Sequence, residues 1–316
     1  MKHFYLVVAI SFLVLSCKEM IKNEVEFAEI QGFDEISFVK PKITNSLTVN
    51  SKDDLLGYWV GNFQANITQE EENTLYDSIS DAESILYRKI TFSIDEIIDN
   101  TILGHSIVAG NISPFKGTLK EDNSFFTIEA DEFNKTNSDG KFSVHIAKSD
   151  SVLKGNWKAY HPQKVKIANR KFNLNKRLFV YDKNSKLEIT FMNSEKFNSI
   201  ELTDTIGSEI EVFEDVEFYS TTDKLFLKNP SVDLLSSDFV SNLTKADIFI
   251  LRNSIFARHG FAFRDKQLRM YFESYNWYMP VFGDVKGELT NIEKINIDLL
   301  LRYEQNAMEY YDTFGR

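Results

Sequence analysis

Cysteine is almost absent from this 316-residue sequence, in which Cys17 is the only one. No disulfide can therefore form within the chain, so folding depends on packing alone even in an oxidising compartment. Histidine is also scarce, and we expect neither a metal site nor a cofactor, because the five histidines lack zinc-ligand spacing. They are His3, His105, His145, His161 and His259.

Positive charge is in short supply too. The chain has 36 Lys and Arg against 47 Asp and Glu, a formal net charge of −11 and a pI near 5.1. Sequence-independent binding to nucleic acid needs a cationic surface that displaces counterions. We therefore expect no nucleic-acid partner, and the same charge disfavours anionic lipid surfaces.

Long apolar runs are limited to the first residues, from Phe4 to Leu15. As a helix this run would span about 18 Å, short of the roughly 20 residues needed to cross a bilayer. With Met1-Lys2-His3 before it and a polar exit, it is typical of a signal peptide, residues 1–16. Val14-Leu15-Ser16-Cys17 resembles the bacterial lipobox, whose cysteine receives a diacylglyceryl thioether. An ordinary secretory signal and an uncleaved anchor are the alternatives.

An acylated Cys17 would attach the chain to a membrane, because each buried methylene contributes about 0.8 kcal/mol. We therefore expect a lipoprotein of the bacterial cell envelope. Lys18-Glu19 does not resemble an inner-membrane retention signal, which favours the outer membrane. Residues 17–50 are polar and lack clear periodicity, as expected of a tether between lipid and folded domain.

From residue 55 to 160 apolar and polar side chains alternate, with turn residues about every eight to twelve positions. Because no helical pattern intervenes, we expect an antiparallel meander that closes into a barrel-like domain. Asp139-Gly140 is expected to form a tight hairpin turn, since glycine tolerates positive φ. The predicted strands are Gly57–Ile67, Arg88–Ile94, Thr101–Ala109, Phe115–Lys120, Ser124–Ala130, Lys141–Ala147 and Val152–Tyr160.

The β-rich region is expected to cover residues 51–228. Later strand-like pieces are Arg177–Tyr181, Leu187–Met192 and Ile210–Phe218. The pattern leaves open whether residues 165–228 extend the first sheet or form a second module. The acidic insertion Thr68–Glu83 is expected to be a loop or short helix over one rim.

Trp59 and Trp157 each lie in a Leu-x-Gly-x-Trp segment, and both are candidates for the barrel interior. The first segment resembles the opening strand of lipocalin-like and avidin-like barrels. Two readings stay open. The indoles either pack in a filled core or line a cavity that holds one small molecule.

In residues 229–316 the spacing of apolar residues changes to the helical period. This pattern predicts a small three-helix module, so the expected fold class is α+β. Thr244-Lys245-Ala246-Asp247 and Thr290-Asn291-Ile292-Glu293 are capping boxes. Gly260 is placed to end the first helix, and Asp265 to begin the second. The last helix is expected to reach about residue 311. Its expected buried stripe is Ile292, Ile295, Leu299 and Tyr303.

The segment from Leu251 to Phe263, LRNSIFARHGFAF, resembles the signature of the YARHG domain family, with Phe256 in place of the tyrosine. The likeness covers about residues 234–304. It implies an extracytoplasmic module of bacterial lipoproteins and envelope proteins, often suggested to bind the cell wall. The activity of the family is not established.

Five residues of this module are candidates for ligand binding: Arg252, Arg258, His259, Trp277 and Tyr278. Arginine forks suit carboxylates, and aromatic faces suit sugars. The alternative is structural. The arginines would bind carboxylates such as Glu293 or free carbonyls, His259 and Gly260 would cap the first helix, and the aromatic pair would close the core.

These observations favour a membrane-anchored, non-catalytic protein that binds peptidoglycan or another envelope component. Catalysis would need a nucleophile or metal, and the sequence has no free thiol, Gly-x-Ser-x-Gly elbow or metal-ligand spacing. Hydrolysis by a pair of carboxylates is one alternative. A purely structural or assembly role is the other.

Overall fold

The computed structural model describes residues 46–133, 136–206, 209–305 and 307, without the side chains of residues 204–206 and 209–211. The predicted signal peptide, Cys17 and most of the predicted tether therefore lie outside the described residues. The end of the tether is already part of the fold. Val49 is fully buried and exchanges backbone hydrogen bonds with Ser149 and Asp150.

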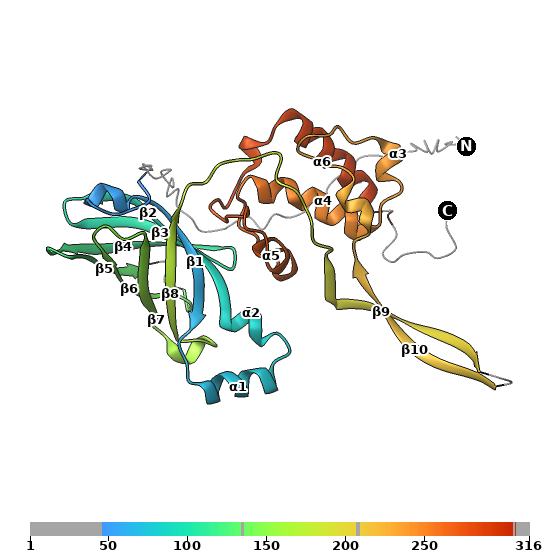
Figure 1. The fold of residues 1–316 in the computed structure, drawn as a ribbon, viewed down its shortest axis with the longest axis horizontal. Helices are drawn as coiled ribbons and strands as arrows, with labels where there is room; N and C mark the ends of the chain where they lie inside the picture. The colour runs from blue at the N-terminus through green and yellow to red at the C-terminus, as the bar shows by residue number, and fades with distance from the viewer. Residues whose placement is uncertain (1–45, 134–135, 207–208, 306, 308–316) are drawn as a thin grey trace, which may run out of the picture. The chain divides into compact units, whose positions relative to one another are not determined.

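Eight antiparallel strands form a closed barrel (Figure 1). Each strand pairs with the next along the chain, and β1 pairs with β8, so the sheet has no free edge. The predicted barrel is confirmed, and it extends past residue 165 to Arg177. The strands are β1 (Gly57–Ala65), β2 (Tyr87–Ile98), β3 (Thr101–Val108), β4 (Asn111–Glu121), β5 (Phe125–Glu132), β6 (Gly140–Ala147), β7 (Val152–Ala159) and β8 (Asn169–Arg177).

Alternate residues of every strand point inward and fill most of the barrel, which explains the period of two in the sequence. Phe92 and Phe115 stack with ring centroids 4.4 Å apart. Phe142 meets Phe92 edge to face at 5.1 Å. Aromatic side chains therefore form the middle of the core. The inward aromatic residues are Trp59, Phe63, Phe92, Phe115, Phe126, Phe142, Trp157 and Phe172.

The expected tight turn at Asp139-Gly140 is wrong. The connection between β5 and β6 covers residues 133–139. Gly140 is the first residue of β6, and its φ is not positive. Its missing side chain makes room for an indole, because a Cβ would lie 2.5 Å from Trp157 Cε2. Asp139 does shape the turn, since its carboxylate accepts a hydrogen bond of 3.1 Å from the backbone of Thr136.

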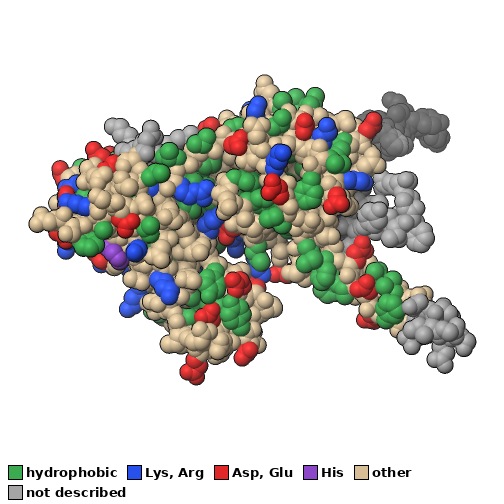
Figure 2. Space-filling model, in the orientation of Figure 1, with side chains coloured by type: hydrophobic (Ala, Val, Ile, Leu, Met, Phe, Trp, Pro, Cys, Tyr) green, Lys and Arg blue, Asp and Glu red, His purple; other side chains and the backbone are tan. Residues whose placement is uncertain are grey.

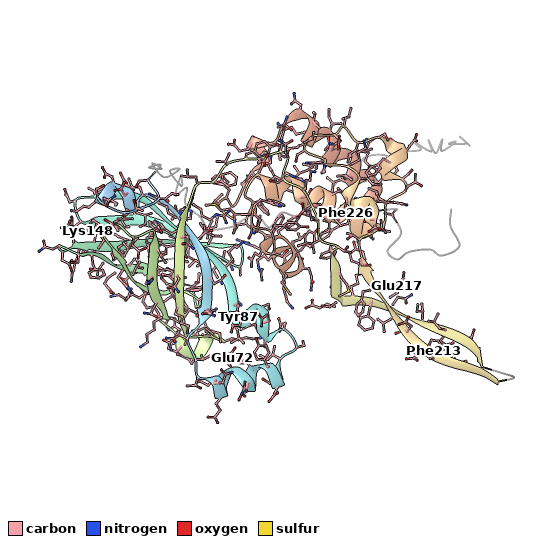
Figure 3. All side chains as sticks on the ribbon, viewed as in Figure 1. Glu72, Tyr87, Lys148, Phe213, Glu217 and Phe226 are labelled. Carbon is pink, nitrogen blue, oxygen red and sulfur yellow. The ribbon has the colours of Figure 1, made fainter. Side chains whose placement is uncertain are left out.

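Short helices lie between the strands. The acidic insertion forms α1 (Gln69–Ser78) and α2 (Ala82–Leu86), and Thr68 and Glu71 make a capping box at the start of α1. Tyr87 Oη donates to Glu72 at 3.0 Å, which links α1 to the start of β2 (Figure 3). The 3-10 helices η1 (Lys52–Leu55) and η2 (Pro162–Lys164) precede β1 and β8.

Residues 178–191, here called the strap, are not strands, so the predicted strands Arg177–Tyr181 and Leu187–Met192 are wrong. The apolar residues Leu187 and Phe191 join the core of the helical module, and side chains of that module bind the strap backbone. A local apolar run cannot distinguish this arrangement from a strand.

The prediction of a strand at Ile210–Phe218 is confirmed. It is part of β10 (Glu209–Ser220), which pairs with β9 (Met192–Ile206) as a two-stranded hairpin.

The carboxy-terminal module contains α3 (Ser237–Val240), α4 (Lys245–Arg258), α5 (Lys266–Glu273) and α6 (Asn291–Glu304), with 3-10 helices η3 (Asp223–Phe226) and η4 (Lys286–Glu288). Both predicted capping boxes are confirmed. Gly260 follows α4 with φ of +77°, the left-handed conformation expected of a glycine at a helix end.

Leu299 of α6 is buried as expected, but the start of the buried face differs from the prediction. Ile292 and Ile295 are 39% and 54% exposed, whereas Glu293 and Asn296 are fully buried. The Asn296 side chain accepts from the backbone of Leu235 at 2.9 Å and donates to two backbone carbonyls. These bonds satisfy polar groups that a hydrophobic pattern would place at the surface. The helix ends at Glu304, and the rest of its predicted extent lies outside the described residues apart from Gln305 and Ala307.

The outer side of the barrel also packs against the helical module. Tyr58 and Val60 of β1 form an apolar cluster with Met279 and Val281. Thr91 of β2 is fully buried, and its hydroxyl donates to the carbonyl of Pro280 at 2.7 Å. The outward faces of β1 and β2 are therefore covered around Tyr58, Val60 and Thr91.

Candidate ligand-binding site

A pocket of about 230 Å³ opens at the end of the barrel where β1 ends and β2 begins. Because the strands are antiparallel, odd-numbered strands reach it with their carboxy-terminal ends and even-numbered strands with their amino-terminal ends. Each strand contributes an inward-facing side chain to the wall. In order from β1 to β8 these are Phe63, Arg88, Ser106, Ser113, Glu132, Phe142, Trp157 and Arg170.

Glu132 is the carboxylate of this wall, and it is 8% exposed. Ser106 Oγ donates to its Oε1 at 2.8 Å, while Gly140 N and Trp157 Nε1 donate to its Oε2 at 2.9 and 3.0 Å. Burial raises the pKa of Glu132 to about 7, although these hydrogen bonds act in the opposite direction.

The hydrogen bonds of Glu132 also suit its neutral form. Both fixed N–H donors face Oε2, which stays an acceptor when the acid is protonated. Oε1 faces only the hydroxyl of Ser106, which can accept a proton donated by the acid. Protonation of Oε1 therefore leaves every bond in place, and the carboxyl group can change charge near neutral pH without rearrangement.

Arg170 lies in the same wall and is 5% exposed. It donates to the carbonyls of Phe63 at 2.9 Å and Ile85 at 2.7 Å, and so holds the carboxy-terminal end of α2 against the barrel. Burial, together with the charge of Arg88, lowers the pKa of Arg170 to about 9. Burial also lowers the pKa of Arg88, whose Nε donates to the carbonyl of Ser84 at 3.3 Å.

The two guanidinium groups lack a direct counter-ion. Within the described parts of the chain, no carboxylate oxygen forms an ion pair with Arg88 or Arg170. Lys166 adds a third cation to the lining. Since Glu132 is the one acidic residue of this lining, the pocket favours an anion, and most strongly when Glu132 is neutral.

The remaining wall is largely apolar. Phe63 meets Trp157 edge to face at 5.8 Å, and Phe142 completes an aromatic surface. On the side of α2, Ile85 packs with Ile167. The volume is below the roughly 300–1,000 Å³ of typical ligand pockets. The pocket therefore suits a small molecule with one anionic group and an apolar body.

The two indoles predicted for the barrel interior both lie inside it, at different ends. Trp59 is fully buried, and its Nε1 donates to the carbonyl of Leu55 at 2.9 Å, so it belongs to the filled end. Trp157 lines the open pocket and bonds Glu132. The filled core and the cavity that the sequence left open as alternatives thus both occur in one barrel, which is filled along most of its length and open at one end.

His259 belongs to a buried polar cluster in the helical module. Its Nε2 lies 2.8 Å from Glu293 Oε2, and its ring stacks on Tyr181 of the strap at 4.1 Å. Tyr181 Oη donates to Glu293 Oε1 at 3.0 Å, and Thr290 N donates to Oε2. Burial favours the neutral acid, yet these bonds lower the pKa of Glu293 to about 2. The cluster therefore fixes the strap to the start of α6.

Arg258 is 3% exposed and also binds the strap. Its Nε donates to the carbonyl of Ser185 at 2.9 Å and its Nη1 to Ser254 Oγ at 2.8 Å. Burial lowers its pKa to about 10. Arg258 is also part of the lining of a groove of about 310 Å³ beside the strap, together with Leu187 and Phe226.

The other three predicted binding residues have partners within the protein. Arg252 makes a two-point contact with the Glu304 carboxylate, with both distances 3.0 Å. Trp277 Nε1 donates to the carbonyl of Lys186 in the strap at 3.1 Å. Tyr278 is buried and its hydroxyl donates to the carbonyl of Phe261 at 2.7 Å. The structure thus brings Arg258, His259 and Trp277 together around the strap.

The sequence analysis missed the charged residues of the barrel pocket, although strand register contains a signal for two of them. Arg88 is in phase with the inward Ile90 and Phe92 of β2, and Arg170 is in phase with Phe172 of β8. A charged residue at the end of an apolar register points into the barrel mouth. Glu132 lay beyond the predicted end of its strand and could not be placed in this way.

Residues 231–305 match the family model of the YARHG domain, which confirms the resemblance for the carboxy-terminal module. Comparison with curated proteins and with solved structures gave no match. The matched segment contains all five residues predicted to bind a ligand. The strap, which Arg258, His259 and Trp277 contact, precedes it.

Neither a metal centre nor a membrane-spanning helix is found in the described part of the chain. Over those residues, no three His, Cys, Asp or Glu side chains gather in a way that could hold a metal ion. Their helices are too short or too polar to cross a bilayer.

Proposed function

We propose that this chain is a lipid-anchored envelope protein whose barrel binds a small amphiphilic anion without transforming it. The observation that carries the proposal is the barrel pocket, in which Arg88 and Arg170 approach an aromatic surface and no carboxylate of the described residues pairs with them directly. Guanidinium groups form strong charge-assisted hydrogen bonds with carboxylates and phosphates.

The arrangement of the pocket specifies the ligand class further. The anionic group would lie toward Arg170 and Arg88, and the apolar body would contact Phe63, Phe142 and Trp157. Ionised Glu132 would repel an anion, whereas neutral Glu132, whose proton is shared with Ser106, would not. Binding should therefore be stronger below pH 7 than above it.

The YARHG domain has a supporting role in this proposal. Arg258, His259 and Trp277 hold the strap that leads from the barrel to the helical module. Arg258 and His259 are buried, and all three side chains are bonded within the protein, which favours a structural role over direct contact with peptidoglycan. Recognition of an envelope ligand is accordingly assigned to the barrel.

Hydrolysis by two carboxylates is less well supported. Such enzymes place two carboxyl groups roughly 5–10 Å apart across the substrate. Glu132 has the raised pKa of a general acid, but its neighbour Asp139 binds Thr136 in the turn, and the pocket lining described here includes one carboxylate. Binding alone accounts for the lining.

The ligand-binding part is tested by calorimetric titration of the purified protein with octanoate, with octanol as the neutral analogue. We expect saturable binding of octanoate and weaker binding of octanol. Arg170→Met should weaken octanoate binding by about tenfold or more, because a charge-assisted bond contributes roughly 1.5–3 kcal/mol. Lys171→Met is the matched control, since Lys171 is the next residue of β8 and is exposed on the outer face. An equal loss in both variants, or no saturable binding, would refute the proposal.

The anchor is tested separately by Cys17→Ser. This change removes the sulfur that would be acylated, so the protein should move from the membrane fraction to the aqueous fraction on cell fractionation. Continued sedimentation with lipid would count against the anchor and leave the pocket unaffected.

A further inference from the structure

The β9–β10 hairpin, residues 192–220, has a composition unlike the rest of the chain. It contains eight acidic residues and one basic residue, Lys196, a net charge of −7 out of the −11 of the whole sequence. Apolar residues are interspersed among the acidic ones, and Figure 2 shows hydrophobic and acidic side chains side by side on this hairpin. Such a mixture is unusual for a surface that faces only water.

Large apolar side chains on both sides of the hairpin are exposed. On one side Phe197 is 53%, Val212 60% and Val216 41% exposed. On the other side Phe213 is 48% and Leu202 37% exposed, and Figure 3 labels Phe213 on β10. A two-stranded hairpin with uncovered faces is only marginally stable in water, so a covering partner would stabilise it.

The strand register places a like-charge pair in the middle of the first side. Glu201 of β9 lies directly opposite Glu214 of β10, between the neighbouring pairs Ser199–Val216 and Thr203–Val212. Like charges directly opposite each other destabilise a sheet. No cation of the described residues forms an ion pair with either carboxylate. The face therefore combines an uncompensated acidic pair with exposed apolar groups on each side of it.

We infer that this face, Phe197, Glu201, Val212, Glu214 and Val216, is the docking surface for a partner protein with a cationic, apolar segment. A lysine or arginine of the partner would lie between Glu201 and Glu214, and apolar side chains at strand spacing would cover Phe197, Val212 and Val216.

Charge argues for this partner over the other occupants. A second copy of the chain would bring another −7 hairpin against the first, and an anionic lipid surface would repel it as well. The surface shares no residue with the barrel pocket, so the inference goes beyond ligand binding and adds an assembly role.

The probe is a fluorescein-labelled ten-residue peptide of alternating valine and lysine, with the valine–glutamate peptide as its negative control. Binding to the full chain is measured by fluorescence anisotropy. We expect binding of the cationic peptide alone, with affinity that falls steeply as salt is added. The double variant Glu201→Gln/Glu214→Gln should weaken it about five- to thirty-fold. Val212→Ser/Val216→Ser should weaken it without changing its salt dependence.

The control is Glu70→Gln/Asp77→Asn, which removes the same charge from exposed positions of α1. It should leave peptide affinity unchanged. Equal loss in the control would mean that overall charge attracts the peptide, and unchanged affinity in the hairpin variant would exclude this face. Either result overturns the inference, as would failure of the unmodified chain to bind the peptide. Sedimentation would also overturn it, in favour of self-association, if the unmodified chain were a dimer and the Val212→Ser/Val216→Ser variant a monomer.

Discussion

The clearest test of the barrel pocket is Glu132→Gln, because the structure predicts both its sign and its pH dependence. A glutamine keeps the shape of the neutral acid. Its Oε1 can accept from Gly140 N and Trp157 Nε1, and its Nε2 can donate to Ser106 Oγ. We therefore expect no lost hydrogen bond and no buried charge at any pH.

The magnitude follows from the pKa. Burial raises the pKa of Glu132 from 4.5 to about 7 in the folded protein. Between these values the folded state binds more protons than the unfolded state, so wild-type stability falls as pH rises from 4.5 to 7 and the loss is complete above 7. A rise of about 2.5 in pKa corresponds to about 3 kcal/mol, and the glutamine variant lacks this loss.

The assay is guanidinium unfolding of wild type and variant from pH 4.5 to 8, followed by tryptophan fluorescence. The contributions of other titrating groups cancel when the free energy of unfolding of wild type is subtracted from that of the variant. This difference should be about 3 kcal/mol larger at pH 8 than at pH 4.5. Glu129→Gln, on the outer face of the same strand, is the control and should give a nearly constant difference. A constant difference for Glu132→Gln would show that Glu132 is already ionised at low pH in the folded protein, and the reasoning would fail.

Three further results are expected. Octanoate affinity, measured by calorimetry, should fall as pH rises through about 7 in wild type and stay constant over that range in Glu132→Gln, because the buried carboxylate repels the anion. Gly140→Ala should lower the free energy of unfolding by about 1–3 kcal/mol, because the added methyl group would overpack against Trp157. Gly287→Ala is the control and should not, since no atom lies near its Cβ. Equal effects of the two changes would contradict the close packing of Gly140 on Trp157. Glu293→Gln should lower the free energy of unfolding at pH 7 by roughly 3–5 kcal/mol. Because the folded pKa near 2 favours the ionised form, wild type should lose stability between pH 4.5 and 2 and the variant should not. Thermal melts in which both proteins lose stability in parallel over that range would contradict this.

Much of the barrel follows from local pattern. The alternation in β1 to β7 needs only the pleat of a strand. The turn expected at Asp139-Gly140 was an exception, because this glycine makes room for Trp157 of another strand. The caps at Thr244 and Thr290 are equally local, because each involves groups three residues apart. These elements were predictable for that reason.

Other features depend on groups far apart in the sequence. The strap is extended without being a strand because Tyr275 and Arg258 bind its backbone. The face of α6 is set by Asn296, which bonds the backbone near Pro230 and Leu235. In both cases a hydrophobic pattern predicted the wrong arrangement, since it contains no information about polar partners from other elements.

The pocket shows the same division. The sequence by itself determined that the chain folds into a barrel-like β domain followed by a capped helical module, and that Arg88 begins one of the alternating strands. Only the tertiary structure decided that β8 completes the barrel and brings Arg88 and Arg170 to the same mouth as Glu132. The physical reason is that side-chain alternation is a property of one strand, whereas closure, burial and the resulting pKa near 7 depend on which strands become neighbours.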